Sequence, residues 1–174
     1  MKNKLSLLYS AQEIARRIDE LALQIRLDYG EEKDFLCVCV LKGAFMFFSD
    51  LVKKLGSNAL CAFIRLSSYG NETKSCGSAK LVCDICEDVS GKDVLIIEDI
   101  VDEGHTLSFL KQYFAQKNAA SVRACCLVDK PAARVQDVRP DYTAFTLTKP
   151  HFVVGYGLDY AQRYRNLPAL FNLE

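Results

Sequence analysis

The sequence has no excess of charge of either sign and no long hydrophobic run. Its 22 basic residues equal its 22 acidic residues, so no basic surface for a nucleic acid is indicated. No apolar run approaches the roughly 20 residues that a membrane helix needs. The apolar part of the N-terminus is also too short for a signal peptide. We therefore expect a cytoplasmic protein that binds neither a membrane nor nucleic acid.

Two common nucleotide-binding motifs are also missing. The sequence contains no G-x-x-x-x-G-K-[ST] loop, and no G-x-G-x-x-G follows an expected strand. It contains no internal repeat, low-complexity tract or interdomain linker. Its 174 residues, half of them apolar, are enough for one domain with a sizeable core. We expect a single domain over residues 1–174.

The eight cysteines allow two interpretations. Cys83 and Cys86 have C-x-x-C spacing, but on a strand their sulfurs would point to opposite faces. No second pair follows at the distance that a zinc ribbon needs. The pattern favours reduced cysteines that pack as small apolar side chains, with structural zinc or disulfides as the alternatives. The packing cysteines are expected within apolar runs, at Cys37, Cys39, Cys61, Cys125 and Cys126.

Short apolar strands alternate with helical patterns, which indicates an α/β fold. Ser10 and Glu13 form a capping-box pattern that begins a helix ending near Gly30. A second helix is expected over 44–55. A third follows Gly104, with Leu107, Leu110 and Phe114 on one face. The strands are expected at 35–41, 59–66, 81–86, 94–97 and 122–128, and the tail from 160 to 174 is expected to be coil with a helical turn.

Residues 67–78 form a polar, glycine-containing segment. Such long segments inside a compact domain are commonly lids or binding loops. The alternative is the tip of a hairpin with no function.

Acidic residues follow the apolar run 94–97 directly. The carboxyl end of a strand in an open α/β sheet is where ligands bind. Glu98, Asp99, Asp102 and Glu103 need a divalent metal, sugar hydroxyls or basic side chains to offset their repulsion. The helix that starts after Gly104 offers amide groups to a phosphate. A ribose phosphate would use both features; the alternative is a solvated strand end and an ordinary helix start.

Residues 97–106 resemble the phosphoribosyl-diphosphate signature of the type I phosphoribosyltransferases. Further segments are similar to motifs of the 6-oxopurine (hypoxanthine-guanine) branch, in the family's order. The resemblance implies a central, mainly parallel sheet flanked by helices, with a small C-terminal hood segment at about 150–174. The similar segments are Leu41–Gly43, Leu66–Gly70, Lys130, Phe152–Tyr160 and Tyr164–Pro168.

The resemblance also implies roles in binding the activated sugar. Glu98 and Asp99 would hold the ribose hydroxyls, and Asp102 would be the general base for the purine proton. Lys42, Gly43 and Arg165 would hold pyrophosphate, and the Leu41–Lys42 peptide is cis in the family. The 5′-phosphate would be bound by Glu103, Gly104, His105, Thr106 and Leu107.

A second group of implied roles concerns the purine and the lid. Lys130 would donate to the 6-oxo group, which disfavours adenine because adenine has a donor there. Phe152 would stack on the base, and Val153 would contact its edge through the backbone. The lid would contain Ser68 and Tyr69. Mg²⁺ is the implied cofactor, with Asp159, Glu98 and Asp99 as its ligands.

The implied reaction belongs to purine salvage. It transfers 5-phosphoribosyl from phosphoribosyl diphosphate to hypoxanthine or guanine, with xanthine also open, giving IMP or GMP and pyrophosphate. A homodimer or homotetramer is the family expectation. The alternative is a non-catalytic relative that binds nucleotide and regulates RNA, which would need a basic face. A metal-carboxylate phosphotransfer domain is disfavoured, because no aspartate directly follows the first strand.

Glu103 departs from the family pattern, which usually has Thr or Ser at this position. A carboxylate pointing inward would repel the 5′-phosphate. We expect the Glu103 side chain to point outward, leaving the hydroxyl contacts to Thr106 and Ser108.

Overall fold

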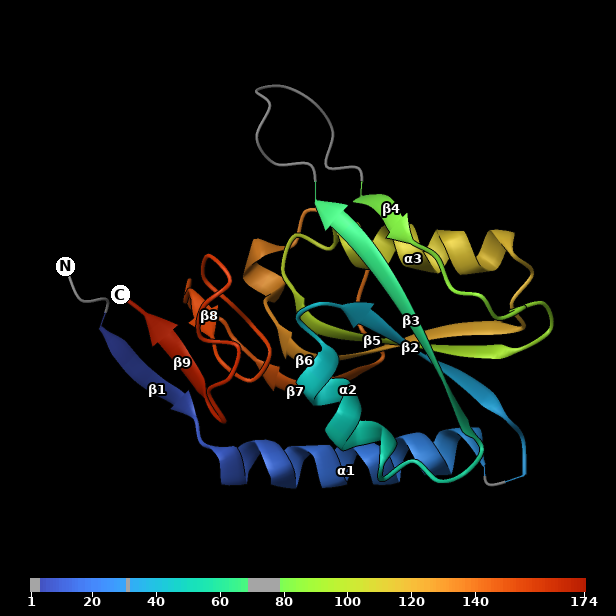
Figure 1. Ribbon diagram of the computed structural model, residues 1–174, viewed down its shortest axis with the longest axis horizontal. Helices are drawn as coiled ribbons and strands as arrows, with labels where there is room; N and C mark the ends of the chain where they lie inside the picture. The colour runs from blue at the N-terminus through green and yellow to red at the C-terminus, as the bar shows by residue number, and fades with distance from the viewer. Residues whose placement is uncertain (1–3, 31, 69–78) are drawn as a thin grey trace.

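A six-stranded sheet forms the centre of the computed structural model (Figure 1). The structure describes residues 4–30, 32–68 and 79–174. The expected lid residue Tyr69 lies outside them, and Ser68 is the last residue of its strand. The strand order is β4-β3-β2-β5-β6-β7, and only β4 is antiparallel to its neighbour. The strands are β2 (Phe35–Leu41), β3 (Ala59–Ser68), β4 (Ala79–Cys83), β5 (Asp93–Val101), β6 (Ser121–Asp129) and β7 (Tyr142–Thr146).

Helices cover both faces of this sheet. α1 (Ala11–Tyr29) and α2 (Phe45–Val52) pack on one face, and α3 (His105–Gln116) packs on the other. A short 3-10 helix, η1 (Pro131–Ala133), follows β6. Because the central strands are covered on both sides, β2 is buried along nearly its whole length.

The N-terminus of α1 confirms the predicted capping box. The Glu13 amide donates to the Ser10 hydroxyl at 3.3 Å, and the Ser10 amide donates to the Glu13 carboxylate at 2.8 Å. These bonds satisfy amide groups that have no partner inside the helix. The buried face of α1 carries the predicted apolar residues Ile14, Ile18, Leu21 and Ile25.

A second, smaller sheet joins the two ends of the described chain. Its order is β1 (Leu5–Tyr9), β9 (Leu170–Leu173) and β8 (Val153–Val154), all antiparallel. The prediction of coil with a helical turn for the tail was therefore wrong at 170–173, and β1 was not predicted. β1 and β9 are short and lie more than 150 residues apart in the sequence, so no local pattern marks their pairing.

Several boundaries differ from the predicted ones. α2 stops at Val52, because the next amides bond three residues back, as in a tight turn. β4 ends at Cys83, where the Asp84 carboxylate accepts from the Ile85 amide and from the Tyr113 hydroxyl. β3 and β6 are slightly longer than predicted. β7 was not predicted.

The cysteines largely confirm the packing interpretation. Seven are described, and all are free thiols. Cys37, Cys39, Cys125 and Cys126 are buried, and burial raises the pKa of the Cys39 thiol to about 12. The prediction was wrong for Cys61, which is exposed because α2 does not cover the outer part of β3. No helix in the described part of the chain is long and apolar enough to cross a membrane.

Candidate active site

Glu98 and Asp99 lie on a strand rather than in a loop after it, whereas Asp102 and Glu103 lie in the turn that follows the strand. β5 continues past Ile97 because Glu98 pairs with Cys126 and Val101 pairs with Asp129 in β6. Glu98 is only 6% exposed, and its Oε2 has no hydrogen-bond partner among the described residues. Two carboxylates are therefore held at a buried strand end.

Burial opposes the charge of both carboxylates. It raises the pKa of Glu98 well above the ordinary value, and the nearby carboxylates of Asp99 and Asp102 add to this effect. Burial also raises the pKa of Asp99 to about 6, although the Ile100 amide donates to Asp99 at 2.9 Å and partly offsets the shift. Such a pair is poised to accept a cation or hydroxyl donors.

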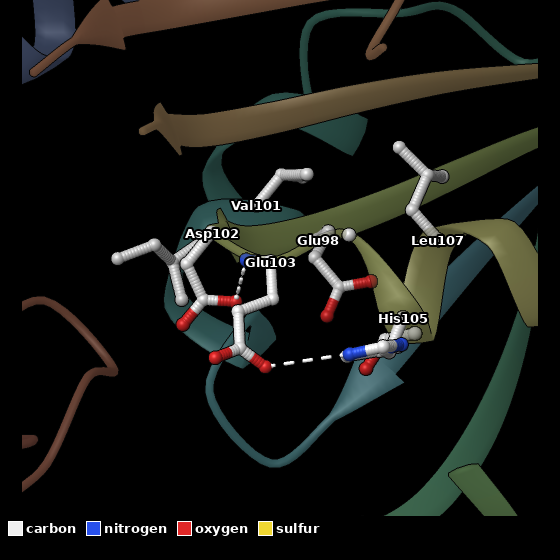
Figure 2. A pocket seen from close by; sticks show the side chains of 9 residues that line it. Glu98, Val101, Asp102, Glu103, His105 and Leu107 are labelled. Carbon is white, nitrogen blue, oxygen red and sulfur yellow. Dashed lines mark hydrogen bonds and ion pairs between the residues drawn. The ribbon is translucent and has the colours of Figure 1, made fainter. Parts of the chain in front are cut away.

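A pocket of about 200 Å³ opens between this strand end and the start of α3. It is lined by Glu98 and by residues 100–107 (Figure 2). Gly104 precedes the helix with φ 87°, a left-handed conformation that favours glycine. The pocket thus combines carboxylates with a helix N-terminus. Asp102 is exposed at this pocket, and its Oδ1 accepts from the Glu103 amide at 2.6 Å.

Glu103 lies at the edge of the pocket. Its side chain is 60% exposed, and its Oε2 is 3.4 Å from the Nε2 atom of His105. In Figure 2 its carboxylate lies between Asp102 and His105. The other ring nitrogen of His105, Nδ1, is 3.2 Å from Nε2 of Gln136. The Glu103 side chain is exposed, as expected, but it stays at the rim of the pocket.

The loop after β2 lies against the acidic strand end. The Leu41–Lys42 peptide is cis, as the family resemblance implied. A Cβ atom on Gly43 would lie 1.5 Å from Oδ2 of Asp99, so no side chain fits there. A Cβ atom on Gly157 would lie 2.1 Å from the carbonyl oxygen of Gly43. The end of β5 and the loops after β2 and β8 therefore meet at very close range.

Arg165 fixes the loop after β8. Its Nη1 donates to the Gly157 carbonyl at 2.6 Å, and its Nη2 is 2.5 Å from Oδ1 of Asp159. The other carboxylate oxygen of Asp159 accepts from the Gln162 amide at 2.8 Å. Arg165 and Asp159, the candidate pyrophosphate residue and one of the candidate purine residues, thus belong to one hydrogen-bonded group.

Lys130 follows β6 at the same edge of the sheet. Its Nζ donates to the His151 carbonyl at 2.5 Å, and its amide donates to the Val101 carbonyl at 2.9 Å. Burial lowers the pKa of Lys130, and the Asp102 carboxylate partly offsets this shift. Phe152 is 51% exposed beside this loop, free to present its ring to a ligand.

Comparison with known proteins identifies the family. Residues 5–161 match the model of the phosphoribosyl transferase domain. The chain is 44% identical over 161 residues to the hypoxanthine-guanine phosphoribosyltransferase of Bacillus subtilis, covering 92% of this chain and 88% of that protein. The chain belongs to the phosphoribosyltransferase family.

Solved structures agree with this assignment. A hypoxanthine-guanine phosphoribosyltransferase of Bacillus anthracis superimposes with a TM-score of 0.92 at 39% identity, covering 99% of this chain and all of that one. A hypoxanthine phosphoribosyltransferase of Staphylococcus aureus gives 0.91 at 37% identity, covering 97% and 91% of the two chains. The type I phosphoribosyltransferase fold predicted for this chain is therefore confirmed.

Sequence reasoning missed one basic residue of this phosphoribosyltransferase site. Arg134, beyond η1, donates to the carbonyls of Val101 and Asp102. The segment from 131 to 139 has no hydrophobic periodicity and no motif, so nothing in it indicated a contact with the acidic loop. Its local signal is two arginines, Arg134 and Arg139, among small, apolar and polar residues, which is not specific.

The carboxylates fit a hard divalent cation. Glu98 has a buried oxygen without a partner, and Mg²⁺ prefers oxygen ligands. Within the described ranges, no three His, Cys, Asp or Glu side chains converge as a metal-binding group. A metal at this site would therefore take further oxygens from the substrate, as Mg²⁺ commonly does with phosphate groups.

We expect the buried Glu98 carboxylate to favour ligand binding but to lower the stability of the ligand-free protein. The pKa of Glu98 is higher in the folded protein than in the unfolded chain, where it is about 4.3. The contribution of Glu98 to stability is therefore fully present below the unfolded pKa and is lost as the pH rises through the folded pKa. We predict that Glu98→Gln stabilises the ligand-free protein by about 1–3 kcal/mol at about pH 8, because the amide carries no charge.

Chemical denaturation with a metal chelator present measures this difference. The difference in unfolding free energy between Glu98→Gln and the unaltered protein should disappear toward about pH 4, where Glu98 is protonated. Glu103→Gln, at an exposed position, is the control and should change little. A less stable Glu98→Gln protein at about pH 8 would contradict the prediction.

Proposed function

We propose that this chain transfers the 5-phosphoribosyl group from phosphoribosyl diphosphate to hypoxanthine or guanine, with xanthine as a further candidate. The products are IMP or GMP and pyrophosphate, in purine salvage. The observation that carries the proposal is the meeting of β5, the turn after it and the loop after β6 at one sheet edge. They hold an orphaned Glu98 oxygen, the exposed carboxylate of Asp102 and the part-buried ammonium of Lys130. The names of the relatives agree with it.

Asp102 is the proposed general base. As a ring nitrogen of the purine bonds to C1 of the ribose, the bond from C1 to the pyrophosphate oxygen breaks. The ring proton passes to the Asp102 carboxylate, which is held by the Glu103 amide. Charge develops on the sugar as an oxocarbenium-like centre, and the carboxylates of Glu98 and Asp99 beside the ribose hydroxyls stabilise it.

The 5′-phosphate is proposed to bind at the start of α3. The left-handed Gly104 turns the chain so that the following amides point into the pocket. The Thr106 hydroxyl lines the same pocket. The proposed contacts are those of Glu103, Gly104, His105, Thr106 and Leu107.

Lys130 is proposed to select 6-oxopurines. In the ligand-free chain its ammonium donates to the His151 carbonyl, so it has an acceptor that a 6-oxo group can replace. Adenine offers an amino donor there and would leave the ammonium unpaired. Phe152 stacks on the base, and Val153, buried in β8, contacts its edge through the backbone.

The departing pyrophosphate is proposed to be bound by the Lys42–Gly43 loop and by Arg165. Gly43 has no room for a side chain, which lets the backbone approach the phosphates. Hypoxanthine-guanine phosphoribosyltransferases need a divalent metal, and we propose Mg²⁺ with Glu98, Asp99 and Asp159 as its candidate ligands. Since these side chains do not converge as one group among the described residues, oxygens of the substrate would have to complete the site. When bound, Mg²⁺ offsets the charge of the departing pyrophosphate.

The wider organisation is proposed on the same grounds. Residues 1–174 act as one phosphoribosyltransferase domain, with residues 150–174 as the hood over the purine. Ser68 and Tyr69 belong to a lid at about 67–78. The protein assembles as a homodimer or homotetramer and works in the cytoplasm, where its free thiols stay reduced. No observation favours the non-catalytic RNA regulator, since the net charge is zero.

A substrate assay tests this function directly. Hypoxanthine, guanine, xanthine and adenine are each incubated with phosphoribosyl diphosphate and Mg²⁺, and nucleotide formation is followed. We predict turnover of at least one of the first three and none of adenine, because of the Lys130 donor. The absence of turnover with every 6-oxopurine would refute the proposed function.

Asp102→Asn tests the general base. An amide cannot accept the ring proton, so we predict a kcat lower by about 100- to 10,000-fold with KM values nearly unchanged. The matched control is Asp34→Asn, an exposed carboxylate just before β2, at the end of that strand away from the site, which should keep full turnover. Near-normal kcat in Asp102→Asn would show that another group takes the proton.

Glu103→Ser tests the unusual acid at the phosphate pocket. Removing one negative charge from the rim should lower KM for phosphoribosyl diphosphate by about two- to tenfold at low salt, with less effect as salt is added. Glu87→Ser, at an exposed position after β4, is the control and should not change KM. An unchanged KM in Glu103→Ser would show that the carboxylate does not act on the phosphate.

A further inference from the structure

Arg134 lies beside the turn that follows β5, and its guanidinium donates to four groups. Its side chain is only 13% exposed. Nε donates to the Asp102 carbonyl at 2.8 Å, and Nη2 donates to the Val101 carbonyl at 3.1 Å. The remaining donors reach the Val138 carbonyl and the Asp129 carboxylate. One side chain therefore fixes four points of the backbone and side chains around it.

These acceptors belong to loops that serve different substrates. Val101 and Asp102 lie at the end of β5, on the phosphoribosyl side of the site. Asp129 ends β6 and directly precedes Lys130, on the purine side. The Lys130 amide also donates to the Val101 carbonyl at 2.9 Å. Arg134 thus connects the loop of the proposed base to the loop of the proposed purine-binding lysine.

The rest of the segment supports the same loop. The amides of Val135 and Gln136 both donate to the Glu103 carbonyl, each at 3.0 Å. A Cβ atom on Gly104 would lie 2.9 Å from Cδ of Arg134 and 2.9 Å from a methyl carbon of Val138. The turn from 101 to 104 is therefore seated directly on residues 134–138.

Arginine suits this place better than lysine. A guanidinium is planar and carries five N–H donors in a fixed fork, whereas an ammonium is a point charge with rotatable donors. Its pairing with Asp129 also offsets the cost of burying the charge. A lysine could keep the ion pair but could not reach the carbonyls on both sides at once.

We propose that Arg134 is a positioning residue, which holds the Asp102 carboxylate in line with a purine bound at Lys130. This inference rests on the proposed phosphoribosyltransferase function. Arg134 contacts only protein groups, and acts through the backbone of Asp102 and through Asp129. Because the base is needed only in the transition state, its misplacement lowers kcat and leaves KM largely unchanged.

The test compares Arg134→Gln and Arg134→Lys with the unaltered protein. We expect kcat per folded molecule to fall about 10- to 100-fold in Arg134→Gln and less in Arg134→Lys, with KM for both substrates within about threefold. The matched control is Arg17→Lys. Arg17 also donates to two backbone carbonyls, those of Ala144 and Thr143, at 2.9 and 3.1 Å, but it lies on α1. This control should keep the kcat of the unaltered protein.

The possible failures are distinguishable. If the unaltered protein turns over no 6-oxopurine, the proposed function itself fails. If it is active and both Arg134 variants keep its kcat within about twofold, or lose activity only in proportion to folded protein, the inference on Arg134 is overturned. Should Arg134→Gln not fold, Asp129→Asn and Arg134→Lys decide: reduced kcat with retained KM supports the inference, and unchanged kcat in both overturns it.

Discussion

Two adjacent carboxylates at the end of a buried strand are the constraint on which the rest of the site depends. Glu98 and Asp99 continue β5 instead of leaving it, because β6 pairs with β5 as far as Val101, beyond the last pair with β2 at Ile97. Burial raises the pKa of each group, and Glu98 keeps one oxygen without a partner. The ligand-free protein therefore carries an unfavourable charge arrangement that a cation or hydroxyl donors would relieve.

Other parts of the fold are shaped around this pair. Asp99 lies so close to Gly43 that the loop after β2 admits no side chain there, and Gly157 in turn lies against the Gly43 carbonyl. Arg165 then holds the Gly157 carbonyl and the Asp159 carboxylate. A continuous line of close contacts thus runs from the acidic strand end to the C-terminal segment. A side chain added at either glycine would separate the parts of the site, and at Gly157, where φ is 101°, it would also strain the backbone.

Local sequence patterns predicted the core of the fold well. The uniform apolar run at 35–41 is a central strand, and the capping box of α1 forms as expected. The small sheet escaped prediction because β1 and β9 are short and meet only when the two chain ends come together. Most candidate site residues came from family motifs rather than from local physics. Arg134 has neither a motif nor a periodic pattern, and its importance depends on contacts with residues about 30 positions away.

The sheet order also explains why three unrelated loops can serve one reaction. β2, β5 and β6 are adjacent and parallel, so their carboxyl ends meet at one edge, about 4.8 Å apart from strand to strand. The loop after β2 is proposed to hold pyrophosphate, the end of β5 the ribose, and the loop after β6 the purine. Pyrophosphate, ribose and purine also follow one another in this order along the bond that breaks and the bond that forms. In the proposed arrangement, the leaving group and the incoming base would lie on opposite sides of the sugar because their strands lie on opposite sides of β5. Arg134 joins the end of β5 to the end of β6. As a positioning residue it would act on the geometry of bond formation rather than on the affinity for either substrate.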